Sequence, residues 1–407
     1  MSAFTLFRQP GFATLWLTGV LYGTMRWLEV LVIALYTFEL TASPLSVAGM
    51  MFLRMLPMIL FGSVLGAAAD RFNRLRLLQA GFVLLIITSA CVAALAFSGQ
   101  LALWQLAVAV FASGSVFSAD LTLRRMLLGE AAGPARLGQG LALDSATSNA
   151  TRMIGPLLGG LAYETLGLVG VYGIAAGCFA VLAVALGRLD ASAPGPSTST
   201  TAFTQALRDA VDYVRGRPEI QATLAVTVVI NMFAFPVASM VPVIGREDFA
   251  LSPAAVGLLA SGEGAGAFVG ALVLSWLIKP TYYIRAYVAG SAVFLSAVTL
   301  FSTASGLWPG WTLLVAGGLG VAGFAAMQPT LIMSFSAPAL RGRVMGLVTV
   351  CIGTGPIGIL HLGLMAEWLT PALAVRVMAL EGLLLLGVLL LRFPMLRRSG
   401  VGQIASD

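Results

Sequence analysis

Apolar residues along this chain fall into twelve long runs separated by short polar segments. A helix that crosses the hydrocarbon core of a bilayer needs about 20 apolar residues, so each run is long enough to span a membrane. The runs cover residues 11–36, 45–68, 76–98, 101–128, 138–163, 167–187, 219–244, 252–278, 282–304, 309–336, 341–367 and 371–393. The pattern predicts an all-α membrane protein with twelve transmembrane helices.

One polar segment, residues 188–218, is much longer than the others and separates the first six runs from the last six. It begins with a Pro-, Ser- and Thr-rich stretch at 191–201, a composition typical of flexible linkers. Apolar residues then recur at helical spacing and predict a short amphipathic helix on the membrane surface: Phe203, Leu207, Ala210, Val211 and Val214. We expect an N-terminal six-helix bundle at 1–187, a cytoplasmic linker at 188–218 and a C-terminal six-helix bundle at 219–407.

The composition supports a membrane protein, because 59% of the 407 residues are hydrophobic and only 10% are charged. In soluble domains about 45–50% of the residues are apolar and about 25% are charged. Cys91, Cys178 and Cys351 lie in three separate apolar runs, and this spacing suggests neither a disulfide framework nor a metal site. The first run is long and lacks a small-residue cleavage site, so we expect it to remain as the first helix.

Basic residues are distributed unevenly between the two sides of the predicted membrane. The side of the N-terminus holds 18 Lys and Arg residues, whereas the opposite side holds only Arg246 and Arg376. Positively charged loops are retained in the cytoplasm, so we expect a multi-pass protein of the inner membrane with both termini in the cytoplasm. The net charge of +6 comes from short loop clusters rather than from a basic domain, so nucleic-acid binding is not indicated.

Four short motifs lie at the ends of the predicted helices or within them. They are Gly66–Arg76, in which small residues precede Asp70, Arg71, Arg74 and Arg76; Gly155-Pro156-Leu157-Leu158-Gly159-Gly160; the glycine-rich stretch Gly257–Gly270 around Glu263; and Arg341-Gly342-Arg343-Val344. The motifs resemble those of the major facilitator superfamily, whose loop between helices two and three reads Gly-x-x-x-Asp-Arg-x-Gly-Arg. Within it they resemble the drug and siderophore exporter branch typified by the bacterial enterobactin exporter. The resemblance implies two six-helix bundles with pseudo-twofold symmetry that give alternating access to a central site.

The resemblance assigns the first motif to a cytoplasmic latch. Asp70 would lie near the N-terminus of helix eleven, where the helix dipole favours an acid by about 0.3–1 kcal/mol. The simpler alternative is that Asp70 and the arginines only end helices and orient the chain. The candidate latch residues are Gly66, Asp70, Arg71, Arg74, Arg341 and Arg343.

Two positions depart from the family pattern of the latch. Asn73 replaces a glycine, and Asn tolerates a positive φ angle better than most residues. The corresponding loop after helix eight, residues 279–285, contains no acid. We therefore expect the latch after helix two to be the stronger one.

The helix-five motif combines a proline with three glycines. Pro156 cannot donate a hydrogen bond to its helix and is expected to kink it, while Gly155, Gly159 and Gly160 allow another helix to approach closely. The resemblance implies a seam that prevents proton leakage in an exporter. Plain helix packing explains the same residues.

Ionisable residues inside the apolar runs are candidates for proton coupling, because an unpaired charge in the bilayer is costly and usually functional. These candidates are Glu29, Glu263, Asp120 and His361. Glu29 shares a helix face with Arg26, which fits an ion pair as well as proton exchange. Glu263 stands among glycines that shield it little. Asp120 precedes Arg124 by four residues, which favours a structural pair, and His361 lies near the outer end of its helix.

Other polar and aromatic side chains are candidates for an amphipathic substrate cavity. They are Arg26, Trp27, Arg54, Arg152, Asn231, Phe233, Phe235 and Gln328. Arg54 has no partner on its own helix, so it would face the cavity or meet Glu29 or Asp120. Arg152 would face the cavity or bridge helices, and each remaining residue taken alone also fits packing. The three arginines favour a substrate with an anionic group.

The sequence predicts a proton-coupled secondary active exporter of a medium-sized amphipathic, drug-like or siderophore-like substrate. The alternatives are a lipid or lysolipid flippase or an importer on the same fold, and a non-transporting receptor or scaffold. No nucleophile–base pair, phosphate-binding loop or metal cluster is evident in the sequence, so we expect neither an enzyme nor an ATP-driven pump. The expected energy source is the proton gradient without a cofactor, and the expected partners are a small-molecule substrate and the lipid bilayer, with the chain as a monomer.

Overall fold

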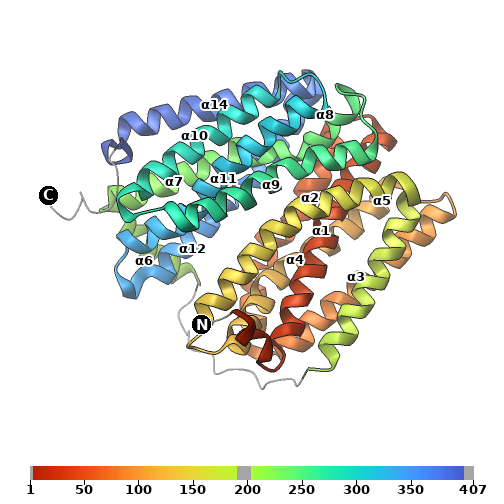
Figure 1. Ribbon diagram of the computed structural model, residues 1–407, viewed down its shortest axis with the longest axis horizontal. Coiled ribbons are helices and arrows are strands. Elements are labelled where there is room, and N and C mark those ends of the chain that lie inside the picture. The colour runs from red at the N-terminus through yellow and green to blue at the C-terminus, as the bar shows by residue number, and fades with distance from the viewer. Residues whose placement is uncertain (1–2, 190–202, 398–407) are drawn as a thin grey trace. The chain divides into compact units, whose positions relative to one another are not determined.

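A computed structural model of the chain describes residues 3–189 and 203–397, and every regular element in these two ranges is helical (Figure 1). Side chains are described throughout these ranges except at residues 3–5, 62–71, 203–207 and 339. The Pro-, Ser- and Thr-rich stretch at 191–201 therefore lies outside the described residues.

The first part of the chain forms five long α-helices after a short 3₁₀ helix. These elements are η1 (Ala3–Arg8), α1 (Phe12–Thr41), α2 (Pro44–Arg71), α3 (Arg74–Phe97), α4 (Leu103–Ala132) and α5 (Leu137–Gly187). Helix α5 has 51 residues, but Gly167 interrupts it with φ 62° and ψ −173°, a conformation that glycine adopts without steric cost. Two spanning helices therefore meet at Gly167, where the predicted run 167–187 begins.

The second part of the chain is divided more finely than its apolar runs. Its elements are α6 (Phe203–Arg215), α7 (Pro218–Phe233), η2 (Phe235–Ser239), α8 (Val241–Glu247), α9 (Pro253–Leu277), η3 (Pro280–Tyr282), α10 (Tyr283–Phe301), α11 (Leu307–Phe335), η4 (Pro338–Leu340), α12 (Arg341–Ile352), α13 (Gly355–Trp368), α14 (Pro371–Arg392) and η5 (Pro394–Arg397). The predicted seventh helix is interrupted at η2, because Pro236 and Pro242 cannot donate backbone hydrogen bonds. The predicted eleventh helix is interrupted before Gly355, and Pro356 occupies the first turn of α13.

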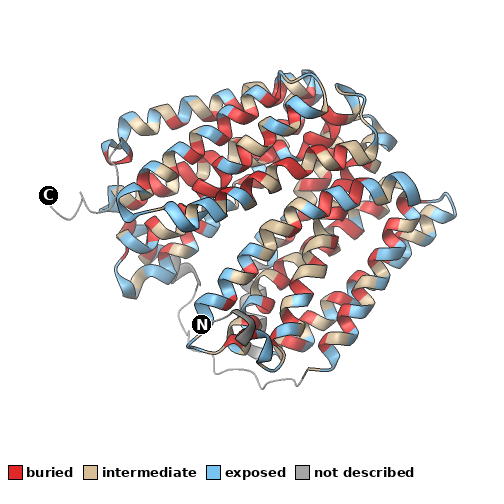
Figure 2. Cartoon of the chain, in the orientation of Figure 1, coloured by how far each residue is buried: buried red, intermediate tan, exposed pale blue. Residues whose placement is uncertain are grey.

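Eleven helical segments of the described chain are long and apolar enough to cross a membrane. One of them is α5, which its break at Gly167 divides into two spans, so the predicted all-α fold with twelve spans is confirmed. Figure 2 shows buried residues on the helix faces that meet and exposed residues on the outward faces. Four exposed tryptophans, Trp104, Trp276, Trp308 and Trp368, lie at helix ends. Tryptophan is enriched at membrane–water interfaces, so these positions fit spanning helices.

The contacts among its residues divide the chain into two compact units. The first comprises Met1–Ala42, Met50–Thr200 and Ser252–Gly257, and the second comprises Ser43–Gly49, Thr201–Leu251 and Leu258–Asp407. In the first unit α5 packs against α1 and α3, and in the second unit α10 packs against α11 and α14. The sequence predicts a boundary between the two bundles within 188–218. The apolar pattern does not reveal that Ser43–Gly49 groups with the second unit or that Ser252–Gly257 groups with the first.

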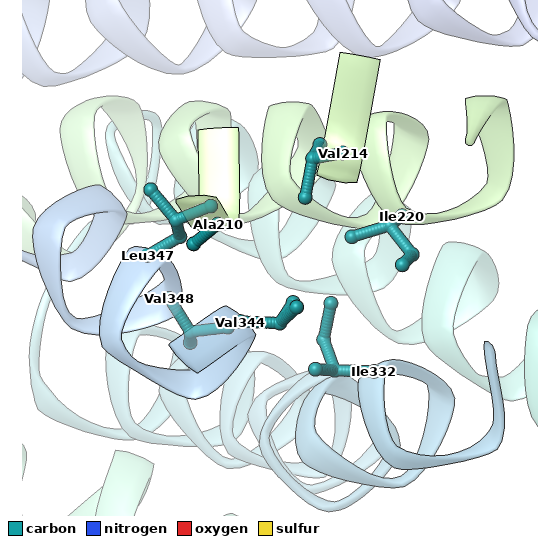
Figure 3. Close-up of a cluster of buried hydrophobic side chains, with 7 residues drawn as sticks. All are labelled: Ala210, Val214, Ile220, Ile332, Val344, Leu347 and Val348. Atoms are coloured by element: carbon teal, nitrogen blue, oxygen red, sulfur yellow. The ribbon is translucent and has the colours of Figure 1, made fainter. Parts of the chain in front are cut away.

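Helix α6 lies within the segment where an amphipathic helix is predicted, and its apolar face packs inside the second unit (Figure 3). Ala210 and Val214 belong to a buried cluster with residues of α7, α11 and α12, namely Ile220, Ile332, Val344, Leu347 and Val348. The Asp209 carboxylate accepts a hydrogen bond from Arg343 Nη1 at 2.8 Å, and the Tyr213 hydroxyl accepts one from the Ala337 amide at 2.9 Å. These contacts attach α6 to the beginning of α12 and to the segment between α11 and η4.

Candidate functional site

One face of α1 carries a row of polar residues. Tyr22, Arg26 and Glu29 are four and three residues apart, so they lie above one another on the helix surface. Tyr22 and Glu29 are 2% and 3% exposed, so this polar face points into the helix packing and not towards lipid.

A hydrogen-bonded relay joins three helices in the middle of the first unit. Arg54 Nη1 on α2 donates to Ser113 Oγ on α4 at 3.0 Å, and Ser113 Oγ donates to Glu29 Oε2 on α1 at 3.3 Å. All three residues are buried. Arg54 therefore meets Glu29 through Ser113, which is one of the arrangements that the sequence left open.

The guanidinium group of Arg26 does not pair with Glu29 among the described residues. It lies 4.6 Å from the ring centroid of Trp27 and 4.4 Å from that of Phe117, in cation–π geometry. Arg152 lies 5.2 Å from the centroid of Trp27. Trp27 thus brings two of the predicted cavity arginines together on α1 and α5.

Three buried donor atoms of this region have no hydrogen-bond partner in the described part of the chain. They are Arg54 Nη2, the Tyr22 hydroxyl and Trp27 Nε1. Leaving a buried donor unsatisfied costs about 1–3 kcal/mol, and more when the donor is charged. A ligand that supplies acceptor oxygens would remove this cost.

Next to the relay lies a network of four charges, of which Asp120, Arg124 and Asp144 are buried and Arg125 is exposed. Arg124 Nε contacts Asp120 Oδ1 at 2.9 Å, and Arg124 Nη1 contacts Asp144 Oδ1 at 2.6 Å. Arg125 Nε lies 3.2 Å from Asp144 Oδ2. The structural pair that the spacing of Asp120 and Arg124 predicts is present, and Asp144 extends it to α5.

A cavity of about 140 Å³ opens between α1, α4 and α5 beside these groups. Its lining joins the polar face of α1 to the charged network and consists of Gly19, Tyr22, Gly23, Arg26, Phe117, Asp120, Leu121, Arg124, Arg125, Asp144, Thr147, Ser148 and Thr151. With all groups ionised, three arginines and two aspartates line it. The cavity therefore suits a ligand with acceptor or anionic groups.

The candidate cavity residues of the second unit pack among its helices. Gln328 Nε2 donates to Thr227 Oγ1 at 2.9 Å, and Asn231 Nδ2 donates to the Thr227 carbonyl at 2.9 Å. The ring of Phe235 contacts the rings of Phe294 and Phe324 edge-on, with centroids 5.2 Å and 6.1 Å apart. Phe233 is half-buried at the end of α7. This geometry matches the packing alternative for Asn231, Gln328 and Phe235.

Two proton-coupling candidates lie in the second unit. Glu263 is half-buried in α9, and a Cβ added at the neighbouring Gly262 would lie only 3.0 Å from the Trp311 carbonyl oxygen of α11. His361 Nε2 on α13 lies 3.5 Å from Glu381 Oε2 on α14, and both side chains are about two-fifths exposed. Glu381, on the spanning helix α14, is thus a further acid of the second unit besides Glu263.

The latch motif is described only in part. The side chains of Gly66, Asp70 and Arg71 lie outside the described residues, so the contact of Asp70 with helix eleven stays a prediction. Arg74 forms an ion pair with Glu130 of α4, and Asn73 accepts the Arg76 amide at 3.1 Å as the N-cap of α3. Asn73 has a φ angle of −64°, so the expectation that this position needs a positive φ angle is wrong.

The two latch arginines at the start of α12 also have partners inside the second unit. Arg341 Nε donates to the Ser336 carbonyl at 3.4 Å, and Arg343 contacts Asp209 of α6.

The helix-five motif lies where α5 approaches α1. A Cβ added at Gly155 would stand 2.9 Å from the Thr24 carbonyl oxygen, and one added at Gly159 would stand 3.0 Å from that of Leu28. Gly155, Pro156, Gly159 and Gly160 are all buried. Within α5 non-helical dihedral angles occur at Gly167 and not at Pro156, so the helix continues through the proline.

Comparison with known proteins adds a family to this geometry. The model of the transmembrane secretion effector family, MFS_3, matches residues 1–407, the whole chain. The chain belongs to this family of the major facilitator superfamily. The predicted resemblance is therefore confirmed, and this transporter is a multi-pass membrane protein whose family acts on small molecules.

Two relatives and one solved structure show how close the similarity is. The transporter is 29% identical to the multidrug efflux pump Tap of Mycolicibacterium fortuitum, over 84% of this chain and 85% of Tap. It is 28% identical to the enterobactin exporter EntS of Escherichia coli, over 80% of this chain and 78% of EntS. The crystal structure of a mutant of the nucleoside transporter NupG shares the fold with a TM-score of 0.74 and 14% identity, over 94% of this chain and 99% of NupG.

Several residues of the transporter's candidate site were not among the sequence candidates, and Ser113, Asp144 and Glu381 show why. Ser113 is uncharged, and its role depends on Glu29, which is 84 residues away. Asp144 contacts arginines 19 and 20 residues earlier in the chain, on another helix. Glu381 lies within the last apolar run and had the signal that identified the other intramembrane acids.

Proposed function

We propose that the transporter is a proton-coupled secondary active exporter of medium-sized amphipathic organic molecules that carry an anionic group. It is proposed to lie in the inner membrane with both termini in the cytoplasm, as the 18-to-2 distribution of basic residues favours. The relatives Tap and EntS are an efflux pump and an exporter by name, which supports the outward direction.

The observation that carries the substrate class is the excess of buried donors in the first unit, of which those of Tyr22 and Arg26 line the cavity. Arg54 Nη2 and the Tyr22 hydroxyl have no acceptor in the described chain. Arg26 and Arg152 stand beside Trp27. An anionic or acceptor-rich head would meet these donors, while the aromatic ring of Phe117 in the cavity wall offers an apolar surface to the rest of the molecule.

Proton coupling is proposed because carboxyl groups lie inside spanning helices. Glu29 is buried within the relay, Asp120 within the charged network, and Glu263 and Glu381 lie in spanning helices of the second unit. A proton bound at one of these groups drives transport only if it changes the relative stability of the inward-open and outward-open states.

Flux measurements in proteoliposomes test this function. An amphipathic carboxylate dye, a cationic dye of similar size and a fluorescent lysolipid are compared with and without an imposed pH gradient. We expect uphill movement of the carboxylate dye only with the gradient, and no such movement when a protonophore collapses it. Gradient-independent movement of the lysolipid would instead indicate a flippase, and no flux of any probe would indicate a receptor or scaffold.

A further inference from the structure

The guanidinium group of Arg54 has two terminal nitrogens in different situations. Nη1 donates to Ser113 Oγ, whereas Nη2 is buried without an acceptor in the described part of the chain. Arg54 as a whole is only 6% exposed, so bulk water does not reach Nη2 to serve as its acceptor. A buried charged donor in this condition is a place for an acceptor that comes from outside the chain.

We propose that Arg54 docks the anionic group of the substrate, and that a proton on Glu29 binds together with this group. The proposal deepens the proposed function and rests on it only for the statement that the bound anion is a transported substrate. Binding itself is an independent property of the first unit.

The hydrogen bonds of the relay explain why proton and anion would bind together. While Glu29 is ionised, Ser113 donates to it and accepts from Arg54, and the two opposite charges offset one another. A protonated Glu29 no longer offsets the charge of Arg54. The neutral carboxyl keeps an acceptor oxygen for the Ser113 hydroxyl and gains an O–H donor of its own. Protonation thus adds one donor to the site and leaves the positive charge of Arg54 uncompensated beside Nη2.

The groups around Glu29 reinforce this sign. Around the relay, Tyr22 of α1 and Tyr172 of α5 interact with both Glu29 and Arg54, and Arg26 of α1 interacts with Arg54. Asp120 of α4 and Arg152 of α5 lie one step further out, where they interact with Arg26. Asp120 is engaged by Arg124 at 2.9 Å. Arg54 interacts with Glu29 through Ser113, whereas the carboxylate that interacts with Arg26 is Asp120. Protonation of Glu29 therefore removes the charge that offsets Arg54, while Asp120 stays beside Arg26 and Arg124.

Thermodynamic linkage makes the effect reciprocal. If a proton on Glu29 strengthens anion binding by some factor, the bound anion strengthens proton binding by the same factor. Exchange of a proton for a substrate requires the opposite sign, because the two must then favour different states. The proton on Glu29 would accordingly accompany the anion, and the exchanged proton would be carried by another acid.

The test uses the purified full-length protein in lipid nanodiscs with two probes that share one apolar body. 1-Pyrenesulfonate remains an anion between about pH 5 and about pH 8, and 1-pyrenemethylammonium remains a cation, so any pH dependence belongs to the protein. Probe binding is followed by quenching of tryptophan fluorescence, and proton uptake by an indicator dye in weak buffer. Coupling energies of this kind usually change affinity by about 5–150-fold.

We expect wild-type affinity for 1-pyrenesulfonate to increase within that range as the pH falls, with proton uptake on binding. Glu29→Gln should hold the high affinity at every pH and abolish the uptake. Arg54→Lys should bind more weakly but keep the pH dependence, and Arg54→Gln should lose binding. Glu247→Gln, at an exposed acid on the end of α8, is the matched control and should behave as wild type.

Two results would overturn the proposal. One is that a Glu29→Gln variant with the unfolding temperature of the wild type still shows the wild-type pH dependence of 1-pyrenesulfonate affinity. The other is stronger binding of 1-pyrenemethylammonium as the pH rises, lost in Glu29→Gln, because a cation would then compete with the proton at Glu29. Linked binding without any flux in proteoliposomes would refute the exporter function and leave the docking site intact.

Discussion

The contact between α2 and α4 at Gly114 offers a direct way to disturb the relay without changing any of its side chains. An ideal Cβ at Gly114 would stand 2.8 Å from the carbonyl carbon of Arg54 and closer still to its oxygen. Carbon atoms in good contact are about 3.5–4.0 Å apart, so Gly114→Ala should push the two backbones apart by about 1 Å. The same shift would lengthen the 3.0 Å bond from Arg54 Nη1 to the adjacent Ser113 beyond hydrogen-bonding distance.

Two measurements follow from this displacement. Overpacking of this kind costs about 1–3 kcal/mol, so Gly114→Ala should unfold at a lower temperature in nanodiscs. It should also weaken 1-pyrenesulfonate binding and reduce its pH dependence, since Arg54 and Glu29 would no longer be connected. The matched control is Gly177→Ala on α5, where nothing lies within 4 Å of the added Cβ. Both variants gain the same helix propensity, so their difference isolates the contact.

The reasoning is refuted if Gly114→Ala unfolds at the same temperature as Gly177→Ala and binds 1-pyrenesulfonate with the pH dependence of the wild type. Lower stability with unchanged linkage would show that the relay tolerates the shift and that the 3.0 Å bond is not what connects the two charges.

Three further substitutions test other contacts. Asp144→Asn should destabilise the protein by about 1–3 kcal/mol in thermal unfolding, because Arg124 and Arg125 lose a buried acceptor while Arg124 keeps Asp120, whereas Asp212→Asn, in an exposed pair, should cost about 0–1 kcal/mol. Arg343→Gln should also cost only about 0–1 kcal/mol, since its pair with α6 is half-exposed; a larger loss would show that the ion pair, not the apolar cluster, holds α6. Glu381→Gln should alter the pH dependence of flux and leave 1-pyrenesulfonate affinity unchanged, and an unaltered flux profile would exclude the acid beside His361 from coupling.

The spans follow from the sequence because hydropathy is additive along a helix. The division of α5 is also visible in the sequence, since the gap between the predicted runs 138–163 and 167–187 ends where Gly167 interrupts the helix. The interruptions around Pro236 and before Gly355 are different, because apolar residues continue through them and hydropathy does not record whether the backbone is helical. The prolines were the available signal for both.

The site follows from the sequence only where its contacts are local. The pair of Asp120 and Arg124 is fixed by four-residue spacing on one helix. Arg26 and Glu29 also share a face, yet aromatic rings of α1 and α4 hold Arg26, and a serine of α4 holds Glu29. Spacing states which residues are neighbours on a helix, but packing against other helices decides which of them interact.

The sign of linkage at Glu29 separates the roles of the intramembrane acids. If the Glu29 proton accompanies the anion, then an acid outside the relay has to carry the exchanged proton, and Glu263 is the sequence candidate in the second unit. Glu263→Gln should then abolish uphill efflux while leaving the pH dependence of 1-pyrenesulfonate binding intact. Glu29→Gln should abolish that pH dependence and still permit gradient-driven efflux. If Glu29→Gln instead abolished uphill efflux and Glu263→Gln did not, Glu29 would be the exchange site, and the anion and the proton would have to compete there.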